Sequence, residues 1–161
     1  MDREQIGAAM DAHFRAVGEA TTAYNMMEMG FSWLFRALLD APNEQVQAIW
    51  SERRNLENRI NIAKALSKVS LSGDLLDRTQ EVFRQLNEMT KKRAEIAHGA
   101  TFAHAEVIGN EVTNHSVRFT GGWTIEGIVE QAKEFRALHF KLSQLGQDIM
   151  ESKAHNNHPP D

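Results

Sequence analysis

Cysteine is absent from this chain of 161 residues, which excludes disulfides, thiolate zinc sites and a cysteine nucleophile. Proline (three residues) and glycine (ten) are too scarce for a low-complexity or collagen-like segment. No charge-free apolar run approaches the roughly 18–20 residues of a membrane span. The first residues, Met1 to Gln5, lack the charged and then apolar pattern of a signal peptide. We therefore expect a cytoplasmic protein that does not enter a membrane.

An excess of positive charge is also missing, since the formal net charge is −4. This balance argues against binding nucleic acid through bulk charge, and we expect no double-stranded DNA partner. It leaves room for a small local basic site. The 42% hydrophobic and 25% charged residues are typical of a globular protein, and this length suits one core. We predict a single domain over residues 1–152 and a disordered polar tail over residues 153–161.

Helical periodicity is the dominant pattern, because apolar residues fall on one face when each residue is given about 100° of rotation. Pro42 separates the first two segments, and Thr124 is expected to cap the last one. Four segments have this pattern: Arg3 to Asp40 as one helix or two, Asn43 to about Val69, Leu75 to a stop at Gly99, and Ile125 to about Met150.

Residues 101–119 differ, because β-branched residues alternate there with polar ones, as a β-hairpin or an ordered loop would require. Long amphipathic helices must bury their apolar faces against one another. The sequence therefore predicts an all-α fold: an up-down helical bundle of four to five helices, with the small β-hairpin or ordered loop inserted before the last helix.

Charged residues within the apolar stripes are the first candidates for a functional site. With Val82 at zero, Arg93 lies at about 20°, in the middle of its stripe, so we expect it to point inward. A buried arginine needs a carboxylate partner or a water-filled or subunit-facing cleft. A structural interpretation pairs Arg93 with Glu28 or Glu57. Two further residues lie on or near apolar stripes, Arg53 and His139.

A second candidate is His98, which follows Arg93 by five residues and lies about 140° further round the helix. It occupies the last turn before Gly99, where the free carbonyl groups favour a cation. Lys91 and Lys92 complete a compact basic stretch that ends at this histidine. Two interpretations stay open: a histidine that only caps the helix, and one with a functional role.

The segment Arg93-Ala-Glu-Ile-Ala-His98-Gly99 resembles the Arg-(four to six residues)-His motif of HEPN domains, the higher eukaryotes and prokaryotes nucleotide-binding superfamily. The surroundings are similar too. Residues 25–34, with Glu28 before an apolar run, resemble the first helix of many small bacterial members. An amphipathic second helix, a third helix ending in Ile-Ala-His-Gly, an insertion and a last helix extend the resemblance over about residues 20–150.

The resemblance implies a homodimer that brings two motif-bearing helices together, and a metal-independent endoribonuclease without a cofactor. Such members are often the toxin of a toxin–antitoxin pair or a phage-defence component, so an antitoxin protein is a further expected partner. Arg93 and His98 would be catalytic, with histidine moving a proton and arginine holding the phosphate. Lys91 and Lys92 would attract the RNA, and Glu95 would lie beside the cleft.

Two other functions compete with a ribonuclease. Nuclease members commonly carry a polar residue after the motif arginine, whereas this chain has Ala94, so a non-catalytic module that binds a nucleotide or a protein is the alternative. A metal-dependent hydrolase is disfavoured. His155 and His158 are too few ligands, and the helix stop separates His98 from His104. We expect no metal site.

Overall fold

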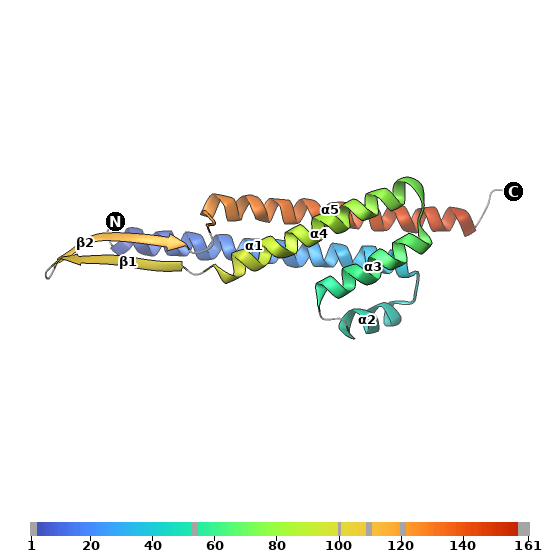
Figure 1. Cartoon of the computed structure of the whole chain (residues 1–161), viewed down its shortest axis with the longest axis horizontal. Helices are drawn as coiled ribbons and strands as arrows, with labels where there is room; N and C mark the ends of the chain where they lie inside the picture. Colours follow the sequence, from blue (N-terminus) through green and yellow to red (C-terminus); the bar gives the residue numbers. More distant parts are fainter. Residues whose placement is uncertain (1–2, 53–54, 100, 109–110, 120–121, 158–161) are drawn as a thin grey trace. The chain divides into compact units, whose positions relative to one another are not determined.

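Five α-helices make up most of the computed structural model, which describes residues 3–52, 55–99, 101–108, 111–119 and 122–157 (Figure 1). Within these ranges, the prediction of a mainly helical chain with four to five helices is confirmed. The helices are α1 (Arg3–Leu39), α2 (Asn43–Glu52), α3 (Leu56–Ser70), α4 (Gly73–His98) and α5 (Ile125–Asn157).

Two antiparallel strands, β1 (Thr101–Ile108) and β2 (Glu111–Phe119), connect α4 to α5. Their register runs from Thr101 opposite Phe119 to Ile108 opposite Glu111, with an irregularity between Glu106 and Val107. The strands form a two-stranded sheet.

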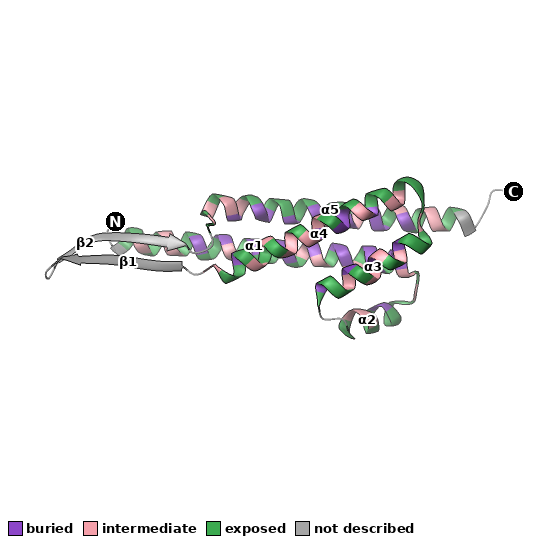
Figure 2. Cartoon of the chain, in the orientation of Figure 1, coloured by how far each residue is buried: buried purple, intermediate pink, exposed green. Residues whose placement is uncertain are grey.

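The described helices carry buried residues at intervals between exposed ones (Figure 2). This alternation is the amphipathic pattern that the sequence predicts. None of the helices in the described ranges combines the length and the apolar character needed to cross a membrane.

The chain divides into two compact units, and α1, α4 and α5 each contribute residues to both. Unit 1 consists of Met1–Tyr24 and Thr90–Phe135. Unit 2 consists of Asn25–Met89 and Arg136–Asp161 and contains all of α2 and α3.

The core of unit 1 is built from residues of α1 and α5 together with Ile96 of α4. Tyr24 and Phe135 meet edge to face, with ring centroids 5.4 Å apart. Such a pair contributes about 0.5–1.5 kcal/mol beyond the area that it buries. The other buried apolar side chains of this core are Ala16, Ala20, Ala23, Ile96, Ile128 and Ala132.

In unit 2, α1 and α5 approach each other closely at two glycines. A Cβ atom on Gly30 would lie 2.8 Å from the backbone oxygen of His139, and one on Gly146 would lie 3.3 Å from the Cα of Leu34. Because residue numbers increase together along both helices, α1 and α5 run parallel here. A side chain at Gly30 would collide with backbone, so the glycine permits this packing.

Aromatic rings tie α2 and α4 to α1 within unit 2. Phe31 lies 5.4 Å from Trp50 of α2 and 6.3 Å from Phe83 of α4, measured between ring centroids. Arg59 of α3 covers the Trp50 ring at 4.2 Å and donates a hydrogen bond to its carbonyl oxygen. The indole is thereby held between α1 and α3.

The prediction of one helix from Asn43 to about Val69 is wrong, because two helices, α2 and α3, occupy this range. Asn55 caps α3: its side-chain oxygen accepts a 2.8 Å hydrogen bond from the Glu57 backbone N–H. Asparagine is among the best capping residues because it satisfies a free N–H group there.

The predicted cap of α5 is confirmed, since Thr124 Oγ1 accepts a hydrogen bond from the Gly127 N–H at 3.0 Å.

The predicted start of the tail at residue 153 is wrong, because α5 continues to Asn157. Lys153 anchors this extension by donating to the carbonyl oxygens of Ala37 and Leu38, at 2.9 and 3.3 Å. It also lies 3.5 Å from the carboxylate of Asp40. A cation at the C-terminal end of α1 satisfies free carbonyl groups, and this favours the longer α5. Residues 158–161 lie outside the described residues.

The close approach of α1 and α5 predicts opposite effects for two glycines of α1. Gly30→Ala should lower the free energy of unfolding by about 1–3 kcal/mol, because the new methyl group meets backbone. Gly18→Ala is the matched control: its Cβ would meet nothing within 4 Å, so it should stabilise by about 0.5–1 kcal/mol. Urea denaturation measures both, and equal effects would contradict this packing.

His13 predicts a pH-dependent stability for the chain. Burial lowers the pKa of this histidine below its usual 6.5, so the folded protein favours the neutral ring. The unfolded chain binds the proton at higher pH, and the free energy of unfolding therefore falls as the pH drops below about 6.5. Denaturation between pH 7.5 and 5 should show a flatter profile for His13→Leu, whereas His155→Gln, at an exposed position, should keep the wild-type slope.

Candidate functional site

The last turns of α4, in unit 1, carry the basic residues that the sequence analysis identifies as candidate site residues. Arg93 is exposed, and its guanidinium carbon lies 5.6 Å from the centre of the buried Tyr24 ring. The expectation of an inward, buried Arg93 is therefore corrected. The long aliphatic stem lets a charged head reach water from a position on an apolar stripe.

The crevice beside Arg93 has no room for a water molecule. It is bounded by apolar and small side chains, together with the arginine itself: Ala20, Thr21, Arg93, Ile96, Ala97 and Phe135. Arg93 thus forms part of an open surface within unit 1. A phosphate would contact it from solvent.

The two lysines before Arg93 differ in their surroundings. Lys91 is exposed, whereas Lys92 donates a 2.9 Å hydrogen bond to the carboxylate of Glu134 on α5. Both members of this ion pair are partly exposed, so it contributes little to stability. Lys91 has the more accessible charge for attracting an anion.

His98 is the final residue of α4 and is exposed. The Gly99 backbone N–H donates to the Glu95 carbonyl oxygen at 3.0 Å and closes the last turn. Glu95 itself is exposed. His98 makes no hydrogen bond or ion pair with other described residues, so its ring nitrogens are open to solvent or a ligand.

Several other candidate residues from the sequence belong to unit 2 or lie outside the described residues. Glu28 is half-buried on α1 and Glu57 is exposed on α3, both in unit 2, and their pairing with Arg93 stays a prediction. Arg53 lies outside the described residues, as do the side chain of His104 and all of His158. Across the described ranges, no three His, Asp or Glu residues form a group that could hold a metal ion.

His139 of α5 is half-buried against α1, and its Nδ1 has no hydrogen-bond partner in the described part of the chain. The same atom would lie 3.0 Å from a Cβ on Gly30. The expectation that His139 lies on or near an apolar stripe agrees with this half-buried position. The ring meets Phe140 at 5.2 Å between centroids.

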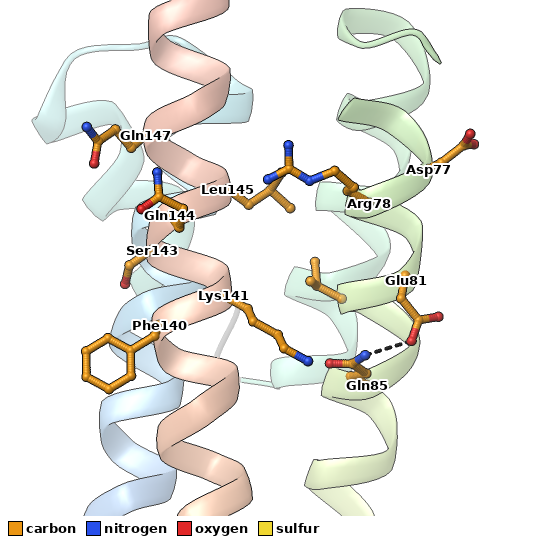
Figure 3. A pocket seen from close by; sticks show the side chains of 11 residues that line it. Asp77, Arg78, Glu81, Gln85, Phe140, Lys141, Ser143, Gln144, Leu145 and Gln147 are labelled. Atoms are coloured by element: carbon orange, nitrogen blue, oxygen red, sulfur yellow. Dashed lines mark hydrogen bonds between the residues drawn. The ribbon is translucent and has the colours of Figure 1, made fainter. Parts of the chain in front are cut away.

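Unit 2 contains a separate groove of about 790 Å³ between α4 and α5 (Figure 3). Val82 and Leu145 give it apolar walls, and Lys141 points from α5 toward Gln85 of α4. Phe140 points away from α4 and is 67% exposed. The groove is thus amphipathic and open to solvent.

Charges along this groove are largely paired. Arg78 joins Asp74 of its own helix to Asp148 of α5. Hydrogen bonds from Arg84 and Gln85 hold the pKa of Glu81 at about 2, well below its usual range. Glu81 therefore stays ionised at any physiological pH, and its charge is offset by Arg84.

A smaller groove between α1 and α2 holds an exposed aromatic residue that the sequence analysis did not select. Trp33 is 51% exposed and lines this groove beside Arg36. The sequence indicates the exposed position of Trp33. This residue follows Tyr24 by nine positions, which places it about 180° further round the helix, opposite the apolar stripe. Met29, which is also exposed, lines the same groove, and two neighbouring exposed apolar side chains indicate a candidate binding surface.

Comparison with protein families, curated proteins and solved structures finds no significant match for the chain. The resemblance to HEPN domains therefore rests on the motif at the end of α4 and on the order of the helices.

The exposed position of Arg93 predicts a small effect of its replacement on stability. Arg93→Met should lower the free energy of unfolding by at most about 1 kcal/mol, because it removes only an exposed cation–π contact with Tyr24. Lys91→Met, at an exposed position without an aromatic contact, is the control and should change stability less. A loss of several kcal/mol in Arg93→Met would instead indicate a buried ion pair.

Proposed function

We propose that this chain is a HEPN-type, metal-independent endoribonuclease in which Arg93 and His98 act on one RNA phosphate. The observation that carries the proposal is that both motif side chains are exposed at the C-terminal end of one helix. Within the described part of unit 1, neither has a carboxylate partner. A cation and a titratable ring are thus both available to a ligand.

The chemistry needs only groups that these two residues supply. His98 accepts the proton of a ribose 2′-hydroxyl, or donates one to the leaving 5′-oxygen. The 2′-oxygen then forms a bond to phosphorus while the bond to the 5′-oxygen breaks, leaving a cyclic phosphate and a free 5′-hydroxyl. Arg93 stabilises the negative charge that develops on the phosphoryl oxygens.

A homodimer would complete this site. Two copies of the α4 end, related by a two-fold axis, would gather two arginines and two histidines in one cleft. One histidine could then act as base and the other as acid. The open surface around Arg93 supports this arrangement, because the crevice in one copy has no room for a ligand.

A non-catalytic binding module is the second candidate. Ala94 follows the motif arginine, where nuclease members commonly carry a polar residue, and Glu95 adds negative charge beside it. In this case Lys91 and Arg93 would hold a nucleotide or a protein partner without cleaving it. In a toxin–antitoxin pair, the antitoxin protein would cover the same surface.

Incubation of purified protein with a mixed RNA in excess EDTA tests the ribonuclease proposal. His98→Ala and Arg93→Ala should each reduce the cleavage rate by at least about 100-fold, since one removes the proton carrier and the other the phosphate contact. His155→Ala, another exposed helical histidine, is the matched control and should cleave like the wild type.

Two results would decide against catalysis by this motif: no cleavage by the wild type, or equal cleavage by His98→Ala. The first result would favour the binding module. Sedimentation measures the dimer independently of activity.

A further inference from the structure

The groove between α1 and α2 is a cavity of about 230 Å³ that lies wholly within unit 2. Pockets for drug-sized ligands run from about 300 to 1,000 Å³, so this one suits a single flat ring system. It is lined by Met29, Ser32, Trp33, Arg36, Asn43, Val46 and Gln47.

Trp33 supplies a flat aromatic surface to this groove. Its side chain is 51% exposed, and its neighbour one turn earlier, Met29, is 61% exposed. The core of unit 2 does not use either side chain, because Gly30 and Leu34 are the residues that face α5. An exposed indole beside an exposed methionine offers an apolar surface on which a planar ring can stack.

The charge of the groove favours an anion. Arg36 lies with its guanidinium carbon 5.7 Å from the Trp33 ring centre, and it forms no ion pair with the described carboxylates. None of the lining residues is acidic. Asn43 and Gln47 of α2 add amide groups, which donate and accept hydrogen bonds.

We propose that this groove binds one unstacked nucleobase of a single-stranded nucleic acid, together with its phosphate. Trp33 stacks on the base, Arg36 contacts the phosphate, and Asn43 and Gln47 hydrogen-bond the edge of the base. Single-strand binders combine these three elements: an aromatic surface, a cation and polar groups at the base edge. The inference goes beyond the proposed cleavage, since binding here requires neither Arg93 nor His98.

The larger groove between α4 and α5 is a poor alternative for the same ligand. Asp77 and Glu81 lie along it, and Arg78 is engaged by two carboxylates. The lining charges of this groove offset one another, since Arg78 and Lys141 oppose Asp77 and Glu81, so it offers a phosphate no net attraction. The absence of acidic lining distinguishes the smaller groove.

Fluorescence anisotropy with labelled 12-mers of oligoadenylate, one RNA and one DNA, tests the proposal. His98→Ala serves as the reference protein, so that RNA stays intact during the measurement. In this background, Trp33→Ala should weaken binding by roughly 10- to 100-fold, the effect expected for loss of one stacked base. Trp33→Phe should lose less, because the ring still stacks.

Two further variants complete the set. Arg36→Gln should weaken binding and reduce its dependence on salt, since one phosphate contact is lost. Val69→Ala removes an apolar side chain on α3 that is 84% exposed and does not line the groove, so its affinity should equal that of the reference. Circular dichroism verifies that each variant is folded.

The outcomes separate this inference from the proposed ribonuclease. Equal losses with RNA and DNA indicate recognition of the base alone, whereas a larger loss with RNA adds recognition of the 2′-hydroxyl. The proposal is overturned if the reference protein binds neither strand, or if Trp33→Ala and Trp33→Phe bind as tightly as the reference. Neither result changes the interpretation of the cleavage assay in EDTA. If that assay shows no cleavage, the binding assay still tests the groove.

Discussion

The backbone contact of α1 with α5 in unit 2 determines what the remaining faces of α1 can do. Gly30 is buried against His139, and Leu34 packs against Gly146 one turn later. With this edge of α1 turned to α5, helical geometry directs Phe31 and Phe35 toward the aromatic cluster and leaves Trp33 outside. One close approach thus accounts both for the core of unit 2 and for its most exposed tryptophan.

The helical regions were predictable from the sequence because apolar periodicity and caps are local signals. Thr124 shows this, since its hydroxyl satisfies the Gly127 N–H as its position predicts. The break at Asn55 was not predictable from periodicity, because Leu56 and Ile60 stay in phase with the residues before it. The extension of α5 depends on Lys153 reaching the end of α1, a contact between residues 116 positions apart, which no local pattern records.

Arg93 shows where the same reasoning fails for a functional residue. A helical wheel gives the direction of each Cβ atom, and the Cβ atom of Arg93 falls within an apolar stripe. The guanidinium, however, lies several bonds further out, with its carbon 5.6 Å from the centre of the Tyr24 ring, and the residue is exposed to solvent. The charged end of a long side chain can therefore reach solvent although its Cα atom lies on an apolar stripe. Ile96, with a shorter side chain on the same stripe, stays buried.

The two candidate surfaces supply complementary interactions to a nucleic acid. The end of α4 offers cations and a titratable ring, and the groove in unit 2 offers an indole beside a cation. A protein with a net charge of −4 gains little from long-range attraction to phosphates, so its affinity must come from short-range contacts. Stacking is such a contact and is insensitive to salt compared with ion pairing. Each surface can therefore be assessed by its own short-range contacts: stacking on Trp33 in the groove of unit 2, and contact of a phosphate with Arg93 in unit 1.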